Sequence, residues 1–247
     1  MNLNPYETAR VLGEYLLFHY GSPEEILPPE RPWPPGMEAA LGFPARTAAR
    51  FSQGRVNRAL DIGCAVGRSS FEMARQCDHV LGIDFSKSFI EAAETLRLGG
   101  GIQYERLEEA SLTTPLVARA PENIPADAIT FVDGDAMDLP PELGQFDRVH
   151  AANLICRLPE PMRFLSRLPD LVKPGGELVL ATPCTWLAEF TPPDQWPPHD
   201  TFGWLNAALE PHFDLRVRDD EPFLIRESAR KFQWTTALLT VWTRKRN

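Results

Sequence analysis

The chain has 247 residues, 43% of them hydrophobic, with a formal net charge of −9 and a pI near 5.1. This length suits one large domain with a substantial core and is short for two. Proteins that hold nucleic acid through its phosphates usually carry a basic balance, so the acidic charge argues against a nucleic-acid partner. No apolar run reaches ~18 residues, and no basic stretch precedes an apolar one near the start, so neither a membrane span nor a secretory signal is expected.

The four cysteines are widely spaced and show no metal-ligand spacing. We therefore expect reduced thiols, no metal site and a cytoplasmic protein.

The first predicted element is a helix. Asn4 can cap it, Pro5 suits its first turn, and Gly21 is a typical end. The proline-rich stretch 22–36 predicts an irregular connector, because proline breaks regular elements. A second helix is expected over 37–52, with a break near its middle.

From about residue 57 the pattern changes to short apolar strands that alternate with helices. Strands are expected at 58–62, 80–83, 129–132, 146–152 and 177–181, with helices at 69–76, 88–97 and 161–171. This alternation predicts a parallel sheet covered on both faces. A helix at 202–209 and strands at 213–217 and 235–242 would complete a seven-stranded mixed sheet.

The expected organisation is an α/β fold with two additions. Residues 1–56 form an N-terminal helical extension with its connector, and residues 57–247 form the main domain. Residues 99–128 are too long for an ordinary link and predict a cap-like insertion.

The most informative motif lies where the first strand ends. An apolar run reaches Asp61 and is followed by a turn with Gly63 and Gly67, and then by a helix; Asp84 ends the next apolar run. Ligands of parallel sheets bind outside the carboxyl ends of the strands, where glycines allow close approach and helix N–H groups face the ligand. Asp84 is placed to accept hydrogen bonds from ribose hydroxyls. The motif predicts a nucleoside-bearing cofactor.

Two cofactors compete for this site. A nicotinamide dinucleotide needs a pyrophosphate cradle, typically GxGxxG, whereas the glycines here are spaced GxxxG. Asp61 would repel pyrophosphate but suits the ammonium of S-adenosylmethionine, and Asp135 can accept from an adenine amino group. The sequence favours S-adenosylmethionine, held by Asp61, Gly63, Cys64, Ala65, Gly67, Arg68, Asp84, Phe85, Asp135, Ala136 and Asn153.

These elements, in this order over residues 58–182, resemble a class I S-adenosylmethionine-dependent methyltransferase. The resemblance implies a Rossmann-like sheet with helices on both faces, and methyl transfer as the activity.

The flanking segments resemble a narrower family, the 4-mercaptohistidine (5-thiohistidine) N-methyltransferases of ovothiol biosynthesis. The similar segments are 4–7 with 15–21, 152–159, 185–192 and 222–231. The resemblance implies N-methylation of the imidazole ring of 5-thiohistidine to give ovothiol A. It also implies a functional link to an iron-dependent sulfoxide synthase, which is often joined to this methyltransferase in one larger enzyme.

A thiolated histidine carries a carboxylate, an ammonium, a ring and a thiolate. Its pocket needs a cation, preferably an arginine fork, together with an acceptor for the amine and aromatic walls. The residues expected to bind it are Tyr15, His19, Tyr20, Arg157, Trp186, Arg226 and Arg230. Arg226 and Arg230 would share a face if their turn is helical.

The expected catalytic residues are His19, Asn153 and Glu227, and His19, Glu227 or a tyrosine would accept a ring proton. Packing or surface ion pairing stays open as the alternative for most of these residues. Two other functions also stay open: methylation of another small carboxylate-bearing molecule, and non-catalytic binding of S-adenosylmethionine.

Overall fold

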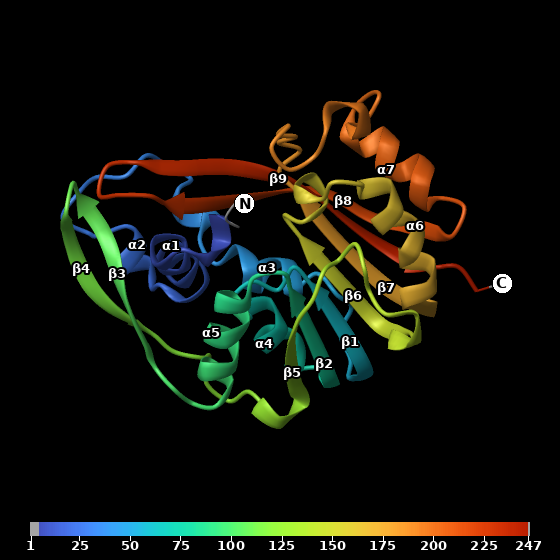
Figure 1. Cartoon of the computed structure of the whole chain (residues 1–247), viewed down its shortest axis with the longest axis horizontal. Coiled ribbons are helices and arrows are strands. Elements are labelled where there is room, and N and C mark those ends of the chain that lie inside the picture. Colours follow the sequence, from blue (N-terminus) through green and yellow to red (C-terminus); the bar gives the residue numbers. More distant parts are fainter. Residues whose placement is uncertain (1–4, 247) are drawn as a thin grey trace.

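The computed structural model describes residues 5–246 and has a seven-stranded sheet at its centre (Figure 1). The strand order is β5-β2-β1-β6-β7-β9-β8. The strands are β1 Val56–Ile62, β2 Cys77–Asp84, β5 Ile129–Asp133, β6 Phe146–Ala152, β7 Val172–Thr182, β8 Phe213–Arg226 and β9 Phe232–Arg244. The first five run parallel, and β9 pairs antiparallel with β7 and β8. The predicted seven-stranded mixed sheet is confirmed.

Helices cover both faces of this sheet (Figure 1). One face carries α3 Phe43–Ala48, α4 Arg68–Ala74 and α5 Lys87–Arg97, and the other carries α6 Pro161–Leu171 and α7 Thr201–Leu209. Each face has its own buried hydrophobic cluster. The parallel strands are apolar because both of their faces are covered.

The N-terminal segment differs from the prediction. Pro5–Glu7 forms a 3₁₀ turn, η1, and the helix α1 (Ala9–Tyr20) begins only after Thr8, whose hydroxyl accepts the Val11 N–H at 3.3 Å. Asn4, the expected cap, lies outside the described residues.

The proline-rich connector is not wholly irregular, so that prediction is wrong. Pro23–Ile26 forms a one-turn helix, α2, closed by a capping box in which Ser22 and Glu25 bond each other's backbone. The second predicted helix divides into the 3₁₀ turn η2 (Glu38–Ala40) and α3, separated at Gly42, which has a φ of 67°.

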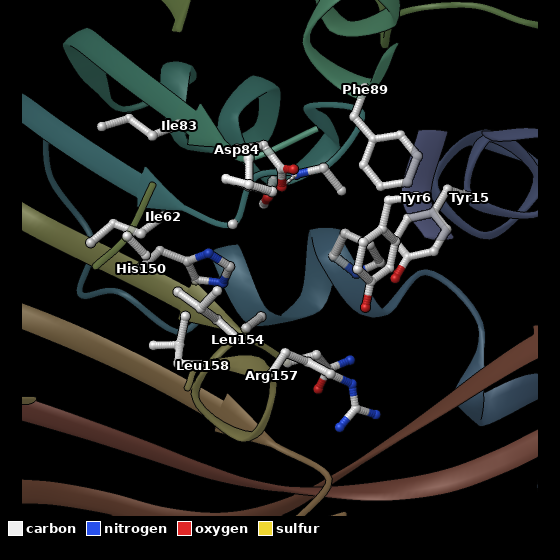
Figure 2. A pocket seen from close by; sticks show the side chains of 18 of the residues that line it. Tyr6, Tyr15, Ile62, Ile83, Asp84, Phe89, His150, Leu154, Arg157 and Leu158 are labelled. Carbon is white, nitrogen blue, oxygen red and sulfur yellow. Dashed lines mark hydrogen bonds between the residues drawn. The ribbon is translucent and has the colours of Figure 1, made fainter. Parts of the chain in front are cut away.

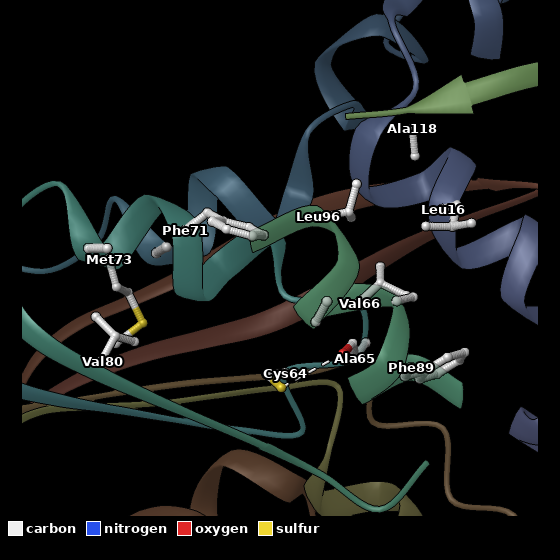
Figure 3. Close-up of a cluster of buried hydrophobic side chains, with 14 of the residues drawn as sticks. Leu16, Cys64, Ala65, Val66, Phe71, Met73, Val80, Phe89, Leu96 and Ala118 are labelled. Carbon is white, nitrogen blue, oxygen red and sulfur yellow. Dashed lines mark hydrogen bonds between the residues drawn. The ribbon is translucent and has the colours of Figure 1, made fainter. Parts of the chain in front are cut away.

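The insertion is a β-hairpin. Strands β3 (Ile102–Glu109) and β4 (Leu112–Ala118) form a two-stranded sheet of their own, and the 3₁₀ turn η3 (Ala126–Ala128) leads into β5. Ala118 belongs to the same buried cluster as Leu16 of α1 and Leu96 of α5 (Figure 3). The β3–β4 hairpin therefore packs against α1.

The last two strands are much longer than predicted. They form a hairpin that extends past the end of the parallel strands to lie beside α1, α2 and the β3–β4 hairpin (Figure 1). Buried Arg226, at the end of β8, donates to the Ile26 carbonyl at 2.9 Å and to Glu108 at 2.6 Å. These bonds join three segments that are far apart in the sequence.

No helix within residues 5–246 is both long and apolar enough to span a bilayer. The same part of the chain contains no cluster of three or more histidine, cysteine or acidic side chains that could hold a metal ion.

Candidate cofactor and acceptor site

A cavity of about 760 Å³ opens at the carboxyl ends of β1, β2 and β6 (Figure 2). The strand ends and their loops form one side, and α1, η1 and the loop after β7 form the other. This is the edge at which parallel sheets bind ligands. The cavity has a polar end near Asp84 and an aromatic end near Tyr15.

The loop between β1 and α4 shapes the polar end. Gly63 and Gly67 have φ angles of 73° and 89°, the left-handed region that favours glycine. A Cβ on Gly67 would lie 2.6 Å from the Phe131 ring, so no larger residue fits there without movement. The Gly63 N–H donates to the Ile83 carbonyl at 2.8 Å, which holds the loop against β2.

Helix α1 holds the same loop from the other side. The Tyr20 hydroxyl donates to the Val66 carbonyl at 2.6 Å. Arg68 donates to the His19 carbonyl at 3.1 Å and pairs with Glu72 at 3.0 Å. Tyr20 and Arg68 therefore support the loop and do not line the cavity.

Asp84 places its carboxylate at the polar end of the cavity (Figure 2). Its oxygens accept the Ala65 N–H at 2.8 Å and the Ser86 N–H at 2.9 Å. Burial raises the pKa of this carboxyl to about 6, although the two N–H groups act in the opposite direction. Asp135 accepts the Met137 N–H at 2.8 Å and lines the cavity together with Ala136.

Asp61, expected to bind an ammonium, lies beneath the cavity. Its side chain is buried, and one oxygen accepts the hydroxyls of Ser69 at 2.7 Å and Ser70 at 2.6 Å. The other oxygen lies 2.7 Å from Nδ1 of His150, whose Nε2 lies 3.0 Å from the Thr47 hydroxyl. Burial alone would raise the pKa of Asp61, but His150 and the two serines bring it below its ordinary value.

Asp61 is therefore buried within a hydrogen-bond network and is not among the residues that line the cavity. His150 lines the cavity in its place (Figure 2).

Rings from η1, α1 and α5 form the aromatic end. The centroid of Tyr15 lies 4.6 Å from that of Phe89, 5.9 Å from that of His19 and 6.0 Å from that of Tyr6. The Tyr6 phenol is in hydrogen-bonding contact with both Tyr15 and Arg157. The result is a chamber with flat apolar walls and polar groups on one side.

Arg157 is the cation of this chamber. Its Nη1 donates to the Thr185 carbonyl at 2.8 Å and to the Cys156 carbonyl at 3.0 Å, and its guanidinium carbon lies 5.0 Å from the Phe190 ring centroid. Within residues 5–246 no carboxylate pairs with it.

Two buried polar atoms of cavity-lining residues have no hydrogen-bond partner in the described structure, Nδ1 of His19 and Oδ1 of Asn153. Such atoms cost about 1–3 kcal/mol and call for an explanation. His19 is 8% exposed, and burial together with the nearby Arg68 charge lowers its pKa to about 3, so the imidazole is neutral near pH 7. Asn153 has a φ of 56°, a conformation that often marks functional positions.

The structure brings ten of the predicted site residues to the cavity wall. They are Tyr15, His19, Gly63, Ala65, Asp84, Phe85, Asp135, Ala136, Asn153 and Arg157. Cys64 and Gly67 instead shape the loop behind it.

The remaining predicted acceptor residues lie elsewhere. Trp186 donates to Thr201 at 3.1 Å and packs edge-on against Trp204, so it lies partly buried against the core and outside the cavity lining. Glu227 pairs with Lys231 at 2.5 Å in the turn after β8. Arg226 is bonded inside the protein, as described above.

Arg230 is exposed in the turn after β8. Arg226 and Arg230 would share a face only in a helical turn, and this condition is not met, because Arg226 ends a strand and the residues after it form a turn.

Among the cavity residues that were not predicted to form the site are Tyr6, Phe89, His150, Glu189 and Phe190. A signal existed for His150, a polar residue inside the apolar run 149–152. Glu189 and Phe190 follow the fifth parallel strand at the edge where ligands bind. Tyr6 lies in segment 4–7, one of the flanking segments noted for family resemblance, whereas Phe89 carried no local signal and reaches the cavity through tertiary packing.

Comparison with known proteins identifies the central part of the chain. Residues 60–180 match a family model described as "Methyltransferase domain". The O-methyltransferase rstn1 of Aspergillus nomiae is 29% identical over 133 residues, which cover 53% of this chain and 49% of that protein. A ubiquinone biosynthesis O-methyltransferase of Marinobacter nauticus is 27% identical over 125 residues, covering 51% and 43%. The chain spans about half the length of these relatives.

Solved structures show the same fold. The N-methyltransferase NodS from Bradyrhizobium japonicum has a TM-score of 0.54 at 16% identity, over 82% of this chain and 93% of that one. The [4+2]-cyclase SpnF has a TM-score of 0.53 at 16% identity, over 83% and 80%. The family match over residues 60–180 and this fold identify a class I S-adenosylmethionine-dependent methyltransferase domain in the central part of the chain, which implies S-adenosylmethionine as the cofactor.

Proposed function

We propose that this chain transfers a methyl group from S-adenosylmethionine to a ring nitrogen of 5-thiohistidine, giving ovothiol A. The observation that carries the proposal is the chamber of Tyr6, Tyr15 and His19 with Arg157 at one side, beside the cofactor loop. A small aromatic ring with an anionic substituent suits such walls.

The polar end of the cavity has acceptors suited to S-adenosylmethionine. Asp84 would accept from the ribose hydroxyls, and Asp135 from the adenine amino group. Asn153 offers the unpartnered Oδ1, so we assign it the ammonium contact that the buried Asp61 cannot make. When bound, S-adenosylmethionine supplies an electrophilic sulfonium methyl group.

At the aromatic end, we assign Arg157 to the carboxylate of the acceptor, because its guanidinium is held in place and has no paired carboxylate in the described chain. Tyr15 and His19 would flank the imidazole ring. Holding reactants in a defined geometry is a main source of rate enhancement in a displacement of this kind.

The attacking ring nitrogen must present a lone pair, so one ring proton has to leave. His19 is neutral near pH 7 and can accept a hydrogen bond from a ring N–H. Its low pKa means that it does not keep the proton, so the ring proton passes to solvent water, and we assign His19 to orienting the ring. Glu227, which was also considered as the proton acceptor, is paired with Lys231 outside the cavity.

The proposal extends to a functional link with an iron-dependent sulfoxide synthase, the class of enzyme that would make the thiolated histidine. It also includes a cytoplasmic location, which the four unpaired cysteines suit.

The test is incubation of the protein with S-adenosylmethionine and 5-thiohistidine, followed by mass spectrometry. We expect methylation at the ring nitrogen next to the carbon that bears the side chain. The Arg157→Ala variant should raise the KM for the acceptor, whereas Glu227→Gln, outside the cavity, should behave as the wild type.

The curated relatives above are named O-methyltransferases, so phenols and small carboxylic acids belong in the same assay. Turnover of one of these without methylation of 5-thiohistidine would replace the proposed acceptor. Cofactor binding without any methyl transfer would indicate a non-catalytic module.

A further inference from the structure

The aromatic end of the cavity contains two formally charged side chains of opposite sign, Arg157 and Glu189. Arg157 belongs to the 3₁₀ turn η5 (Ile155–Arg157) after β6, and Glu189 lies in the loop after β7. Phe190, the neighbour of Glu189, lies 5.0 Å from the Arg157 guanidinium carbon and 6.4 Å, ring to ring, from Tyr6. The two charges are therefore carried to the same end of the cavity.

Neither charge is used in an ion pair across residues 5–246. Both residues line the cavity, where Glu189 is exposed and Arg157 is partly buried. Opposite charges that share a cavity without pairing can each bind an opposite charge of one ligand.

The backbone holds both residues in place. Nη1 of Arg157 donates to two carbonyls, and the Tyr6 phenol contacts the same side chain, so the guanidinium is held at the cavity wall. The loop that carries Glu189 is closed by the buried Thr191, whose hydroxyl donates to the Leu158 carbonyl at 2.7 Å. The Trp196 indole also donates to the Thr191 carbonyl at 2.8 Å.

We propose that Arg157 and Glu189 are two halves of a subsite for a zwitterionic α-amino acid, with the carboxylate at Arg157 and the ammonium at Glu189. The inference rests on the proposed function for the identity of the methylated ring. It goes further by assigning the amine site and by excluding simple acids as good ligands. A carboxylic acid without an amine leaves Glu189 unpaired beside a second negative charge, which selects against it.

The experiment measures ligand binding by calorimetry to the full chain saturated with S-adenosylhomocysteine. The ligands are 5-thiohistidine, histidine, histamine, which has no carboxylate, and imidazolepropionate, which has no amine. The variants are Glu189→Gln and Arg157→Gln, with Asp194→Asn as the control, since Asp194 lies in the same loop but does not line the cavity.

We expect the wild type to bind each zwitterion more tightly than imidazolepropionate, by roughly three- to tenfold for an ion pair at an exposed carboxylate. Glu189→Gln should remove this preference without weakening imidazolepropionate. Arg157→Gln should weaken every ligand that has a carboxylate by about 10- to 100-fold and leave histamine unchanged. Asp194→Asn should reproduce the wild type.

The inference is overturned if Glu189→Gln weakens imidazolepropionate and histidine equally, if the preference for the zwitterion survives in this variant, or if no ligand in the panel binds. Failure of the proposed function is a separate result, read from methyl transfer. Zwitterions that bind with the expected pattern while 5-thiohistidine is not methylated would refute the proposed function and leave the amino-acid subsite standing.

Discussion

The Asp84 carboxylate accepts the backbone N–H of Ala65 at 2.8 Å, so the end of β2 fixes the loop that follows β1. Both residues line the polar end of the cavity. The carboxylate thus holds the loop with one oxygen, and its position on the cavity wall makes it available to a ligand.

The Asp84→Asn variant should therefore bind S-adenosylhomocysteine more weakly, by about 1.5–3 kcal/mol, the usual value for hydrogen bonds to a charged group. Calorimetry at pH 7.5 measures this loss. Asp133→Asn is the matched control, because Asp133 pairs with Asp84 in the β2–β5 register but lies outside the cavity lining. Equal affinities of wild type and Asp84→Asn would refute the ribose role.

Cofactor affinity should also depend on pH through Asp84. Burial raises the pKa of this carboxyl to about 6 in the free protein, and a ligand that donates hydrogen bonds to it favours the charged form. Binding therefore releases a proton below pH 6, and affinity should fall about tenfold per pH unit there and level off above it. A titration of the dissociation constant from pH 5 to 8 tests this, and the slope should vanish in Asp84→Asn.

Arg226 should be important for the stability of the fold and not for binding of the acceptor. It is 4% exposed and bonded to Glu108 and to the Ile26 carbonyl, so Arg226→Met removes the ion pair with Glu108 and leaves the buried Ile26 carbonyl without this donor. We expect a loss of about 2–4 kcal/mol in the free energy of unfolding in urea, with an unchanged KM for the acceptor. Arg230→Ala, in the exposed turn, should change neither quantity. A large rise in the KM for the acceptor in Arg226→Met, without a loss of stability, would mean that Arg226 binds the acceptor.

The parallel sheet was predictable from sequence because its strands are covered on both faces and read as short apolar runs between helices. The two hairpins were not predictable to the same extent. Pro115 interrupts the pattern of β4, and the charged run 216–221 of β8 is largely exposed, so neither strand shows a continuous apolar signal. The capping box at Ser22 was visible in the sequence but was obscured by the prolines around it.

The residues of the candidate site also fall into those that local sequence motifs predict and those that depend on tertiary packing. Residues within the cofactor loop and at strand ends reach the cavity because local motif and position coincide, as at Gly63 and Asp84. The sequence predicted that Asp61 would contact the ammonium of the cofactor, but its actual partner is His150. Strand register sets this partner, because Asp61 lies opposite His150 in the β1–β6 pair. Tyr6 and Glu189 are far apart in the sequence, and tertiary packing brings both to the cavity.

The pair of Asp61 and His150 gives the last prediction, which concerns stability beneath the site. Asp61→Ala leaves His150 and the hydroxyls of Ser69 and Ser70 without their acceptor in a buried position, which should cost about 3–5 kcal/mol of unfolding free energy at pH 7. Asp214→Ala, on the exposed part of β8, is the control and should change stability by less than about 0.5 kcal/mol.

The pH dependence of this difference checks its origin. Burial acts to raise the pKa of Asp61, but the interactions with His150 and the serines outweigh it, so the folded-state pKa lies below the unfolded value of 3.8. The stabilisation from the ionised carboxylate is therefore present above pH 3.8 and is lost as the pH falls through the folded-state pKa. Urea unfolding of wild type and Asp61→Ala from pH 3 to 7 should show the gap narrowing only at the acid end. A gap that is small at pH 7, or that does not change with pH, would mean that the carboxylate contributes little to the fold.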